Sequence, residues 1–432
     1  LYDGRTGELE NPITSGEWLV RDIIRVDEDA RRVYFTACGR EAGRDPCYRH
    51  LYGVNLDGSD LTLLTPEDAD HQVSIRPASE IVALAEMALR GGTPSVPGFS
   101  PSGRYFVDTW SRLDAAPVSL LRSADGALVC TLETADVSEV LSAGWRWPEA
   151  FQVKARDGET DLYGAIYRPS HFDPEQRYPV VDMIYPGPQV VLTPKRSFPQ
   201  EPVETINYTL PQVLAELGFV VVTLDGMSSP FRSKAYHDFA YGRMEDAGGL
   251  EDHLAGLRQL AERHPYMDLD RVGITGHSGG GFASTRAILT YPDFYKVAVS
   301  GAGNHDQLGY QSYWGEKYQG LPESADDIEA VYGAQINSRL AGNLKGKLLL
   351  ITGDMDDNVH PALTLQVANA LIAANKDFDL LVLPNRNHQT SFRDPYVLRR
   401  LLDYFVRHLL GAEPPEGYRI RGPEEASDSP AA

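Results

Sequence analysis

The chain has 432 residues, of which 61 are Asp or Glu and 40 are Lys or Arg, so its formal net charge is −21. This length exceeds what one hydrophobic core usually serves, and it predicts two domains. The acidic charge argues against a nucleic acid or an anionic membrane surface as a partner. No apolar stretch approaches the roughly 20 residues that a membrane-spanning helix needs.

Residues 1–148 are expected to form β structure. Short apolar segments, such as RRVYFTACG and GRYFVDTWS, alternate with Asp-Gly turns. Their spacing suggests antiparallel four-stranded sheets, as in the blades of a β-propeller. A β-sandwich is the alternative, because no strict repeat is visible.

Two features bear on the cellular setting. The chain begins with Leu1 rather than Met, so we expect its N-terminus to be incomplete, and the absence of a secretion signal then says little about its location. Its three cysteines, Cys38, Cys47 and Cys130, have no zinc-binding spacing. Cys38 and Cys47 could bridge neighbouring strands or stay free thiols.

From about residue 149 the pattern changes to strands that alternate with helices. The predicted buried strands cover 180–184, 219–224, 272–275, 297–300, 347–352 and 380–383. Leu250, Leu254, Leu257 and Ala261 share one face of a predicted helix, and Pro361 suits the start of another. This alternation predicts a doubly wound, mostly parallel sheet over 149–412. Residues 413–432 read as a polar tail.

The segment GHSGG, residues 276–280, places one serine among glycines between a predicted strand and a predicted helix. In the G-x-S-x-G pattern the serine occupies a sharp, strained turn that exposes its hydroxyl. The backbone N–H of Gly279 can then face a developing oxyanion. The pattern therefore predicts that Ser278 is a nucleophile.

A serine nucleophile needs a base and an acid that orients the base. In α/β-hydrolases these residues follow the serine along the chain, on loops after later strands. His388 lies after the last predicted strand and is the expected base. Asp354, Asp356 and Asp357 follow the strand before it, and spacing does not choose among them. His360 shares their loop and more plausibly helps to start the next helix.

The segments GHSGGGFAS, DDNVH, IYPGP and NRNHQ together resemble the dipeptidyl peptidase IV branch of the prolyl oligopeptidase family of serine peptidases. The resemblance covers nearly the whole chain. It implies the C-terminal blades of an incomplete propeller over 1–148 and an α/β-hydrolase domain over 149–412. It also implies that the acid is Asp356, the first Asp of DDNVH.

The resemblance further implies roles in substrate binding. Tyr185 matches the tyrosine that supplies the second oxyanion donor, and Asn358 matches an asparagine that binds a substrate carbonyl. The segment 309–320 matches the one that carries pocket aromatics, where Tyr313 and Tyr318 are the expected residues. A one-residue difference in length leaves Trp314 as an alternative.

The resemblance implies hydrolysis of peptide substrates through an acyl-enzyme, with Pro or Ala next to the cleaved bond. No metal or other cofactor is expected, and a homodimer is plausible. The family's dipeptide trimming depends on a pair of glutamates, which residues 1–148 do not supply in a comparable context. An esterase or acyl-aminoacyl hydrolase, or an inactive binding fragment, is therefore kept as an alternative.

Overall fold

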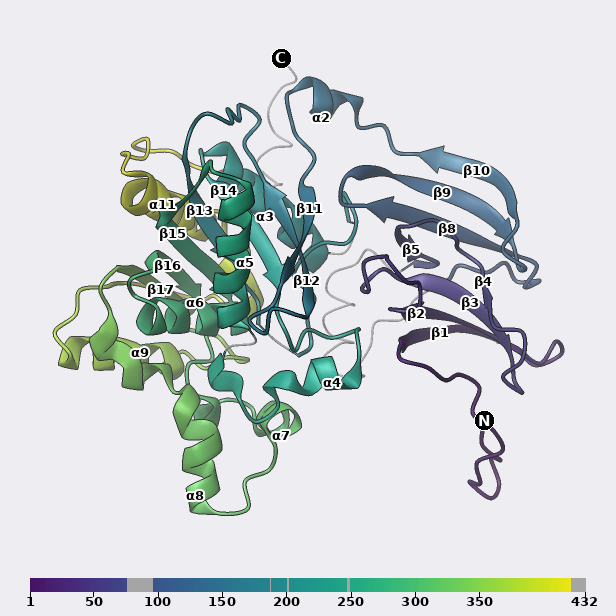
Figure 1. Cartoon of the computed structure of the whole chain (residues 1–432). Helices are drawn as coiled ribbons and strands as arrows, with labels where there is room; N and C mark the ends of the chain where they lie inside the picture. The colour runs from purple at the N-terminus through teal and green to yellow at the C-terminus, as the bar shows by residue number, and fades with distance from the viewer. Residues whose placement is uncertain (76–95, 187, 200–201, 247–248, 421–432) are drawn as a thin grey trace. The chain divides into compact units, whose positions relative to one another are not determined.

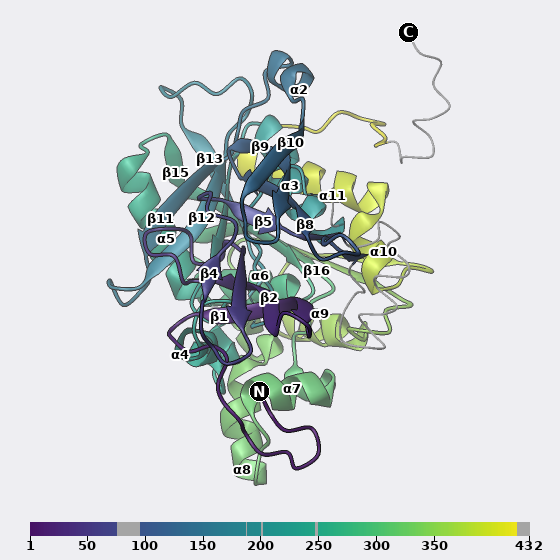
Figure 2. The same ribbon diagram turned by 90° about the vertical axis from the view of Figure 1, so that its right-hand side faces the viewer.

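The computed structural model describes residues 1–75, 96–186, 188–199, 202–246 and 249–420 (Figures 1 and 2). The chain divides into two compact units. The first unit contains Leu1–Ala150 together with Thr193–Leu210 and Pro230–His237. The second contains Phe151–Leu192, Pro211–Ser229 and the chain from Asp238 onward.

The first unit is built from antiparallel sheets, as the turn-rich pattern predicts. The first sheet has the order β1-β2-β3-β4 and the second the order β10-β9-β8-β5. The strands are β1 (Leu19–Asp27), β2 (Arg32–Cys38), β3 (His50–Asn55), β4 (Thr62–Leu63), β5 (Asp70–Gln72), β8 (Tyr105–Arg112), β9 (Ala115–Ser123) and β10 (Leu128–Thr134). A further antiparallel pair joins β6 (Ser74–Ile75) to β7 (Val96–Pro97), and a short helix, α2 (Ser138–Ser142), follows β10.

The two four-stranded sheets share a hydrophobic core. Tyr34 and Leu51 from the first sheet lie in one buried cluster with Phe106 from the second. Burial of large side chains of this kind contributes about 1.5–3 kcal/mol each. Cys38 and Cys47 form no disulfide among the described residues, and burial raises the pKa of the Cys38 thiol to about 11.

An arginine from a distant part of the chain completes the first unit. Arg196 lies within Thr193–Leu210, and its Nε donates to Oδ2 of Asp70 over 3.1 Å. Arg49 donates to the same carboxylate through its Nε, over 2.8 Å. Asp70 is buried, and the two guanidinium groups offset the cost of burying its charge and hold its pKa below the usual range.

The second unit contains one sheet with the order β11-β12-β14-β13-β15-β16-β17-β18 (Figure 1). The pairs from β14 through β18 are parallel, whereas β12 pairs with β14 in the antiparallel direction. The strands are β11 (Glu149–Lys154), β12 (Asp161–Tyr167), β13 (Tyr178–Met183), β14 (Val220–Asp225), β15 (Met267–His277), β16 (Tyr295–Gly301), β17 (Lys347–Gly353) and β18 (Asp379–Leu383). The predicted mostly parallel sheet is thus confirmed, with a strand at each of the six expected positions.

Helices flank this sheet. In Figure 2 the sheet is seen nearly edge-on, with α5 on one side and α11 on the other. Leu250, Leu254 and Leu257 of α5 are buried, as their spacing predicts. The described α-helices from α3 onward are α3 (Pro202–Glu216), α4 (Lys234–His237), α5 (Leu250–Arg263), α6 (Gly279–Thr290), α7 (Ser312–Gln319), α8 (Ala325–Asp327), α9 (Ala362–Ala373), α10 (His388–Arg393) and α11 (Pro395–Phe405). Short 3₁₀ or π segments lie at Asp238–Ala240, Met244–Asp246, Gln307–Gly309, Ile328–Tyr332, Gly333–Gln335, Asn337–Asn343 and Val406–Leu410.

Within the described ranges, none of the helices has both the length and the apolar composition that a bilayer span requires.

Candidate active site

Ser278 lies at the turn between β15 and α6, as predicted. Its φ of 59° and ψ of −120° are unusual for a residue with a side chain and cost about 1–3 kcal/mol. The turn is held by the Ser278 N–H, which donates to the Gly301 carbonyl over 2.8 Å. A Cβ atom at Gly276 or at Gly280 would lie 2.3 Å from the Ile184 carbonyl oxygen. Both positions therefore require glycine, which explains the pattern around the serine.

The loops after β17 and β18 bring Asp356 and His388 together. His388 Nδ1 lies 2.7 Å from Oδ2 of Asp356, and both side chains are buried. The other carboxylate oxygen, Oδ1, accepts from the N–H groups of Asn358 and Val359 over 3.0 and 2.8 Å. The carboxylate is thus fixed from both sides, and it fixes the imidazole in turn.

The competing residues on the same loop occupy different surroundings. Asp354 and Asp357 are exposed, and Asp354 Oδ1 accepts from the Asn385 N–H over 2.6 Å. His360 is exposed too, and its Nδ1 accepts from the Ala362 N–H over 3.2 Å at the start of α9. His360 therefore sits at a helix start, which is where the sequence suggests it.

Tyr185 lies beside the serine turn. A Cβ atom at Gly279 would lie 3.4 Å from the Tyr185 ring, and Gln189 Nε2 donates to the Tyr185 hydroxyl over 3.4 Å. Burial raises the pKa of Tyr185 above its usual value, although its interactions with Ser278, Gln189 and Gly279 act in the opposite direction. The phenol therefore keeps its proton at neutral pH and can donate a hydrogen bond to an anion.

Asn358 is held by two donors that the sequence reasoning did not single out. The Tyr310 hydroxyl donates to Asn358 Oδ1 over 2.9 Å, and Gln311 Nε2 donates to the same oxygen over 3.1 Å. Two donors on one oxygen identify it as the carbonyl oxygen of the amide. The Asn358 amide nitrogen is then directed away from the Tyr310 hydroxyl and from Gln311 Nε2.

The aromatic segment forms α7 and the turn before it. The rings of Trp314 and Tyr318 lie 5.0 Å apart, and those of Tyr310 and Trp314 lie 5.8 Å apart. Tyr313 points elsewhere, since its side chain is 71% exposed. Burial raises the pKa of Tyr310, and the charges of Tyr185, Tyr313 and Asp356 act in the same direction. The hydrogen bond from Tyr310 to Asn358 places it beside the loop that carries Asp356.

His277 also contacts His388, a contact that the sequence did not predict. Its Nε2 lies 3.1 Å from the main-chain carbonyl oxygen of His388, and the two imidazole rings are 4.7 Å apart. Because His277 precedes Ser278 directly, the serine turn and the base loop are joined at this point. The variable position of G-x-S-x-G offered no sequence signal for such a contact.

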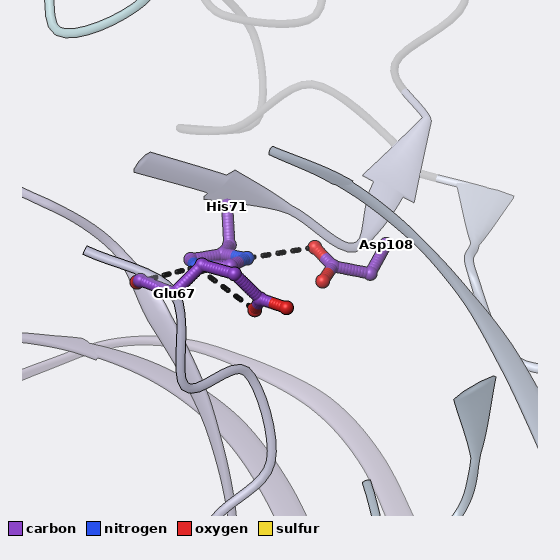
Figure 3. Close-up of side chains that lie close together, drawn as sticks. All are labelled: Glu67, His71 and Asp108. Carbon is purple, nitrogen blue, oxygen red and sulfur yellow. Dashed lines mark hydrogen bonds and ion pairs between the residues drawn. The ribbon is translucent and has the colours of Figure 1, made fainter. Parts of the chain in front are cut away.

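One cluster among the described residues has the side-chain types of a metal site. Glu67, His71 and Asp108 lie close together in the first unit (Figure 3). However, His71 Nδ1 already contacts Asp108 Oδ1 at 2.9 Å, and His71 Nε2 contacts the Glu67 carbonyl oxygen at 3.1 Å. Arg122 pairs with both carboxylates, through Glu67 Oε1 and through Asp108 Oδ2. The guanidinium thus supplies the positive charge that a metal ion would bring, so this cluster is an internal ion-pair network.

Comparison with known proteins places both units in one family. Residues 206–412 match the model of the prolyl oligopeptidase family, and residues 1–117 match that of the dipeptidyl peptidase IV N-terminal region. Human dipeptidyl peptidase 8 is 31% identical over 402 residues, covering 89% of this chain and 40% of the relative. A probable dipeptidyl-aminopeptidase B from Emericella nidulans is 29% identical over 416 residues, covering 93% and 42%.

A solved structure shows the same relation. The crystal structure of a putative dipeptidyl aminopeptidase IV from Bacteroides ovatus superimposes with a TM-score of 0.74 at 27% identity, covering 92% of this chain and 51% of that one. The chain thus spans about half the length of these relatives, or less. The predicted fold class, propeller blades followed by an α/β-hydrolase, is confirmed. The chain belongs to the prolyl oligopeptidase family and is of its dipeptidyl peptidase IV type.

Proposed function

We propose that the chain is a serine peptidase of the dipeptidyl-peptidase type, with Ser278, His388 and Asp356 as its catalytic triad. The observation that carries the proposal is the 2.7 Å contact between His388 and Asp356, made by the loops after β17 and β18. Ser278 follows β15 of the same sheet, and the carboxyl ends of parallel strands share one edge. A strained, half-buried serine at that edge is the group that such an acid–base pair activates.

In the proposed reaction His388 takes the proton of Ser278 as the serine oxygen attacks the substrate carbonyl. Asp356 holds the proton on Nδ1 of His388, so that Nε2 is the basic nitrogen, and it stabilises the imidazolium that forms. The imidazolium then protonates the leaving amine. Water repeats the two proton transfers on the acyl-enzyme and releases the acid.

The negative charge that develops on the carbonyl oxygen is received by Tyr185 and Gly279. The Tyr185 ring lies next to Gly279, where an added Cβ atom would be 3.4 Å from it. The Tyr185 hydroxyl and the Gly279 N–H are therefore near one point, where the oxyanion of the proposed reaction would develop. Donors that are fixed in advance stabilise a transition state more than mobile water does.

The proposed substrate is a peptide with Pro or Ala next to the cleaved bond. The similarity to proteins named dipeptidyl peptidase 8 and dipeptidyl-aminopeptidase B supports a dipeptidyl-peptidase reaction, and the preference for Pro or Ala is the part that the family resemblance implies. Trp314 and Tyr318 are the proposed wall for the small apolar side chain, because their rings pack together near Tyr310. Asn358 would bind a substrate carbonyl through the amide nitrogen that its two donors leave available.

The decisive experiment is a comparison of the chain with its Ser278→Ala variant on a dipeptide-Pro amide. We expect turnover to fall by about 10⁶ in the variant, as in other serine hydrolases. A fluorophosphonate should label the unmodified chain at Ser278 in a one-to-one ratio and should not label the variant. Equal turnover by the two purified proteins would disprove the proposal.

A second assay addresses the substrate. The dipeptide-Pro amide is tested beside a short acyl ester and an acyl-aminoacyl amide. We expect the dipeptide amide to give the highest kcat/KM. Hydrolysis of the ester alone, with normal labelling of Ser278, would keep the triad and contradict the peptidase assignment.

A further inference from the structure

The contact between His277 and the base loop has a defined direction. A main-chain carbonyl oxygen can only accept a hydrogen bond, so the proton between His277 and His388 belongs to Nε2 of His277. The distance of 3.1 Å is that of an ordinary N–H···O bond. The two rings stand at 45° to each other with centroids 4.7 Å apart. His277 thus contacts both the main chain and the ring of His388.

This contact fixes a part of the base that Asp356 does not reach. Asp356 holds the imidazole of His388 through Nδ1. The main chain of His388 lies at the first residue of α10, a helix of six residues that follows a loop. Short helix ends are held weakly by their own hydrogen bonds. An anchor on the His388 carbonyl therefore limits movement of the base toward or away from the serine turn.

We propose that His277 is a positioning residue, which holds the main chain of His388 at a fixed distance from the adjacent nucleophile, Ser278. The inference rests on the proposed function, since it assigns a task within the same triad. In this proposal His277 transfers no proton. Its task is geometric, because a displacement of about 1 Å between reacting groups can reduce a rate by 10²-fold.

The electrostatic state of His277 suits this task. Burial, followed by the charge of His388, lowers the pKa of His277 well below its usual value. The ring is therefore neutral at the pH at which the peptidase would act. A neutral neighbour donates its hydrogen bond without opposing the imidazolium that forms on His388 during catalysis. The charge of His388 acts in the same direction as burial and also disfavours a protonated His277.

The packing around His277 limits which replacements are informative. A Cβ atom at Gly301 would lie 2.9 Å from Nδ1 of His277, so the ring fills the space above that glycine. Phenylalanine keeps a ring in this space and has no donor. Glutamine lacks the ring and can place an amide N–H near the His388 carbonyl. The two variants therefore separate hydrogen bonding from packing.

The test compares the unmodified chain with H277F and H277Q on a dipeptide-Pro amide. We expect H277F to lower kcat by about 10- to 100-fold with KM changed by less than about threefold. H277Q should recover most of this loss and come within about fivefold of the unmodified chain. The thermal unfolding midpoint of each variant shows whether the fold is intact.

A spectroscopic readout distinguishes positioning from general structural support. The proton between His388 Nδ1 and Asp356 gives a downfield proton NMR resonance that is sharp only while the ring is held. We expect this resonance in the unmodified chain and in H277Q, and its loss by exchange broadening in H277F. If a fluorophosphonate does not label Ser278 in the unmodified chain, the proposed function is wrong. If labelling is normal but H277F has the same kcat and the same resonance as the unmodified chain, only the inference about His277 is wrong.

Discussion

At the residue scale, burial distinguishes the three aspartates that the sequence spacing leaves as equal candidates for the catalytic acid. Asp356 is 4% exposed and receives three hydrogen bonds, two of them from the loop that carries it. Asp354 and Asp357 face solvent. A carboxylate that is fixed by N–H donors and shielded from water interacts more strongly with an imidazolium than an exposed one does. The geometry and the family resemblance therefore favour the same residue.

The Asp356→Asn variant tests this choice. We expect kcat on a dipeptide-Pro amide to fall by about 10⁴, because an amide presents the wrong partner to His388 and allows the wrong tautomer. Asp357→Asn is the matched control, since it makes the same chemical change on an exposed neighbour. Its kcat should stay within about twofold of the unmodified chain. A larger loss from the change at Asp357 would refute the assignment.

At the element scale, the apolar strands were predictable and the contacts of their loops were only partly so. Continuous apolar runs indicate buried parallel strands, and the loops at their ends indicate where Ser278 and His388 lie. Tyr310 gave no such signal, because an aromatic residue in a polar segment has no periodicity that reveals its partner. Its hydrogen bond to Asn358 joins two loops separated by 48 residues. Only the folded chain brings them together.

The Tyr310→Phe variant should weaken substrate binding. Loss of the hydroxyl removes one of the two donors that set the Asn358 amide, so its nitrogen is presented less often to the substrate. One neutral hydrogen bond contributes about 0.5–1.5 kcal/mol, so we expect KM to rise by about 3- to 10-fold with little change in kcat. The measurement is steady-state kinetics on a dipeptide-Pro amide.

Tyr404→Phe is the control for this experiment. Tyr404 is buried, and its hydroxyl donates to Asp379 Oδ2 over the same 2.9 Å, between α11 and the start of β18. The change should lower stability and leave KM as it is. If Tyr310→Phe and Tyr404→Phe raise KM equally, the effect at Tyr310 is general loosening and not the orientation of Asn358.

At the scale of the whole molecule, the first unit contains a buried histidine that the sequence pattern did not reveal. His50 is buried, and its Nδ1 contacts the Thr65 carbonyl oxygen at 2.9 Å, while its ring lies 5.0 Å from that of His71. Burial, followed by the charge of His71, lowers the pKa of His50 to about 4. The folded unit therefore keeps His50 neutral in a pH range where the unfolded chain protonates it.

The sign of the resulting pH dependence is fixed. Between the ordinary pKa of 6.5 and the folded value of about 4, the unfolded chain binds the additional proton. Stability contributed by His50 is complete above the ordinary pKa and is lost as the pH falls. Between about pH 7 and about pH 5, the free energy of unfolding of the unmodified chain should fall by about 2 kcal/mol more than that of the His50→Gln variant.

Urea unfolding of both proteins at each pH, followed by circular dichroism, measures this difference. Glutamine has no titrating group here and can still donate to the Thr65 carbonyl, so the hydrogen bond of His50 is retained. Parallel pH profiles for the two proteins would show that His50 titrates alike in the folded and unfolded states.

The first unit is assembled from three separate segments of the chain, and this has a consequence for recombination between homologues. Thr193–Leu210 and Pro230–His237 belong to the first unit, although residues of the second unit precede and follow each of them. A domain swap made at a single junction near Ala150 would take Asp70 and Arg196 from different parents, so the buried carboxylate keeps this counter-charge only where the second parent also has arginine there. Removing one partner of such a buried ion pair costs several kcal/mol. The two halves can thus be shuffled among homologues only as a matched set, with all three pieces of the first unit drawn from the same parent.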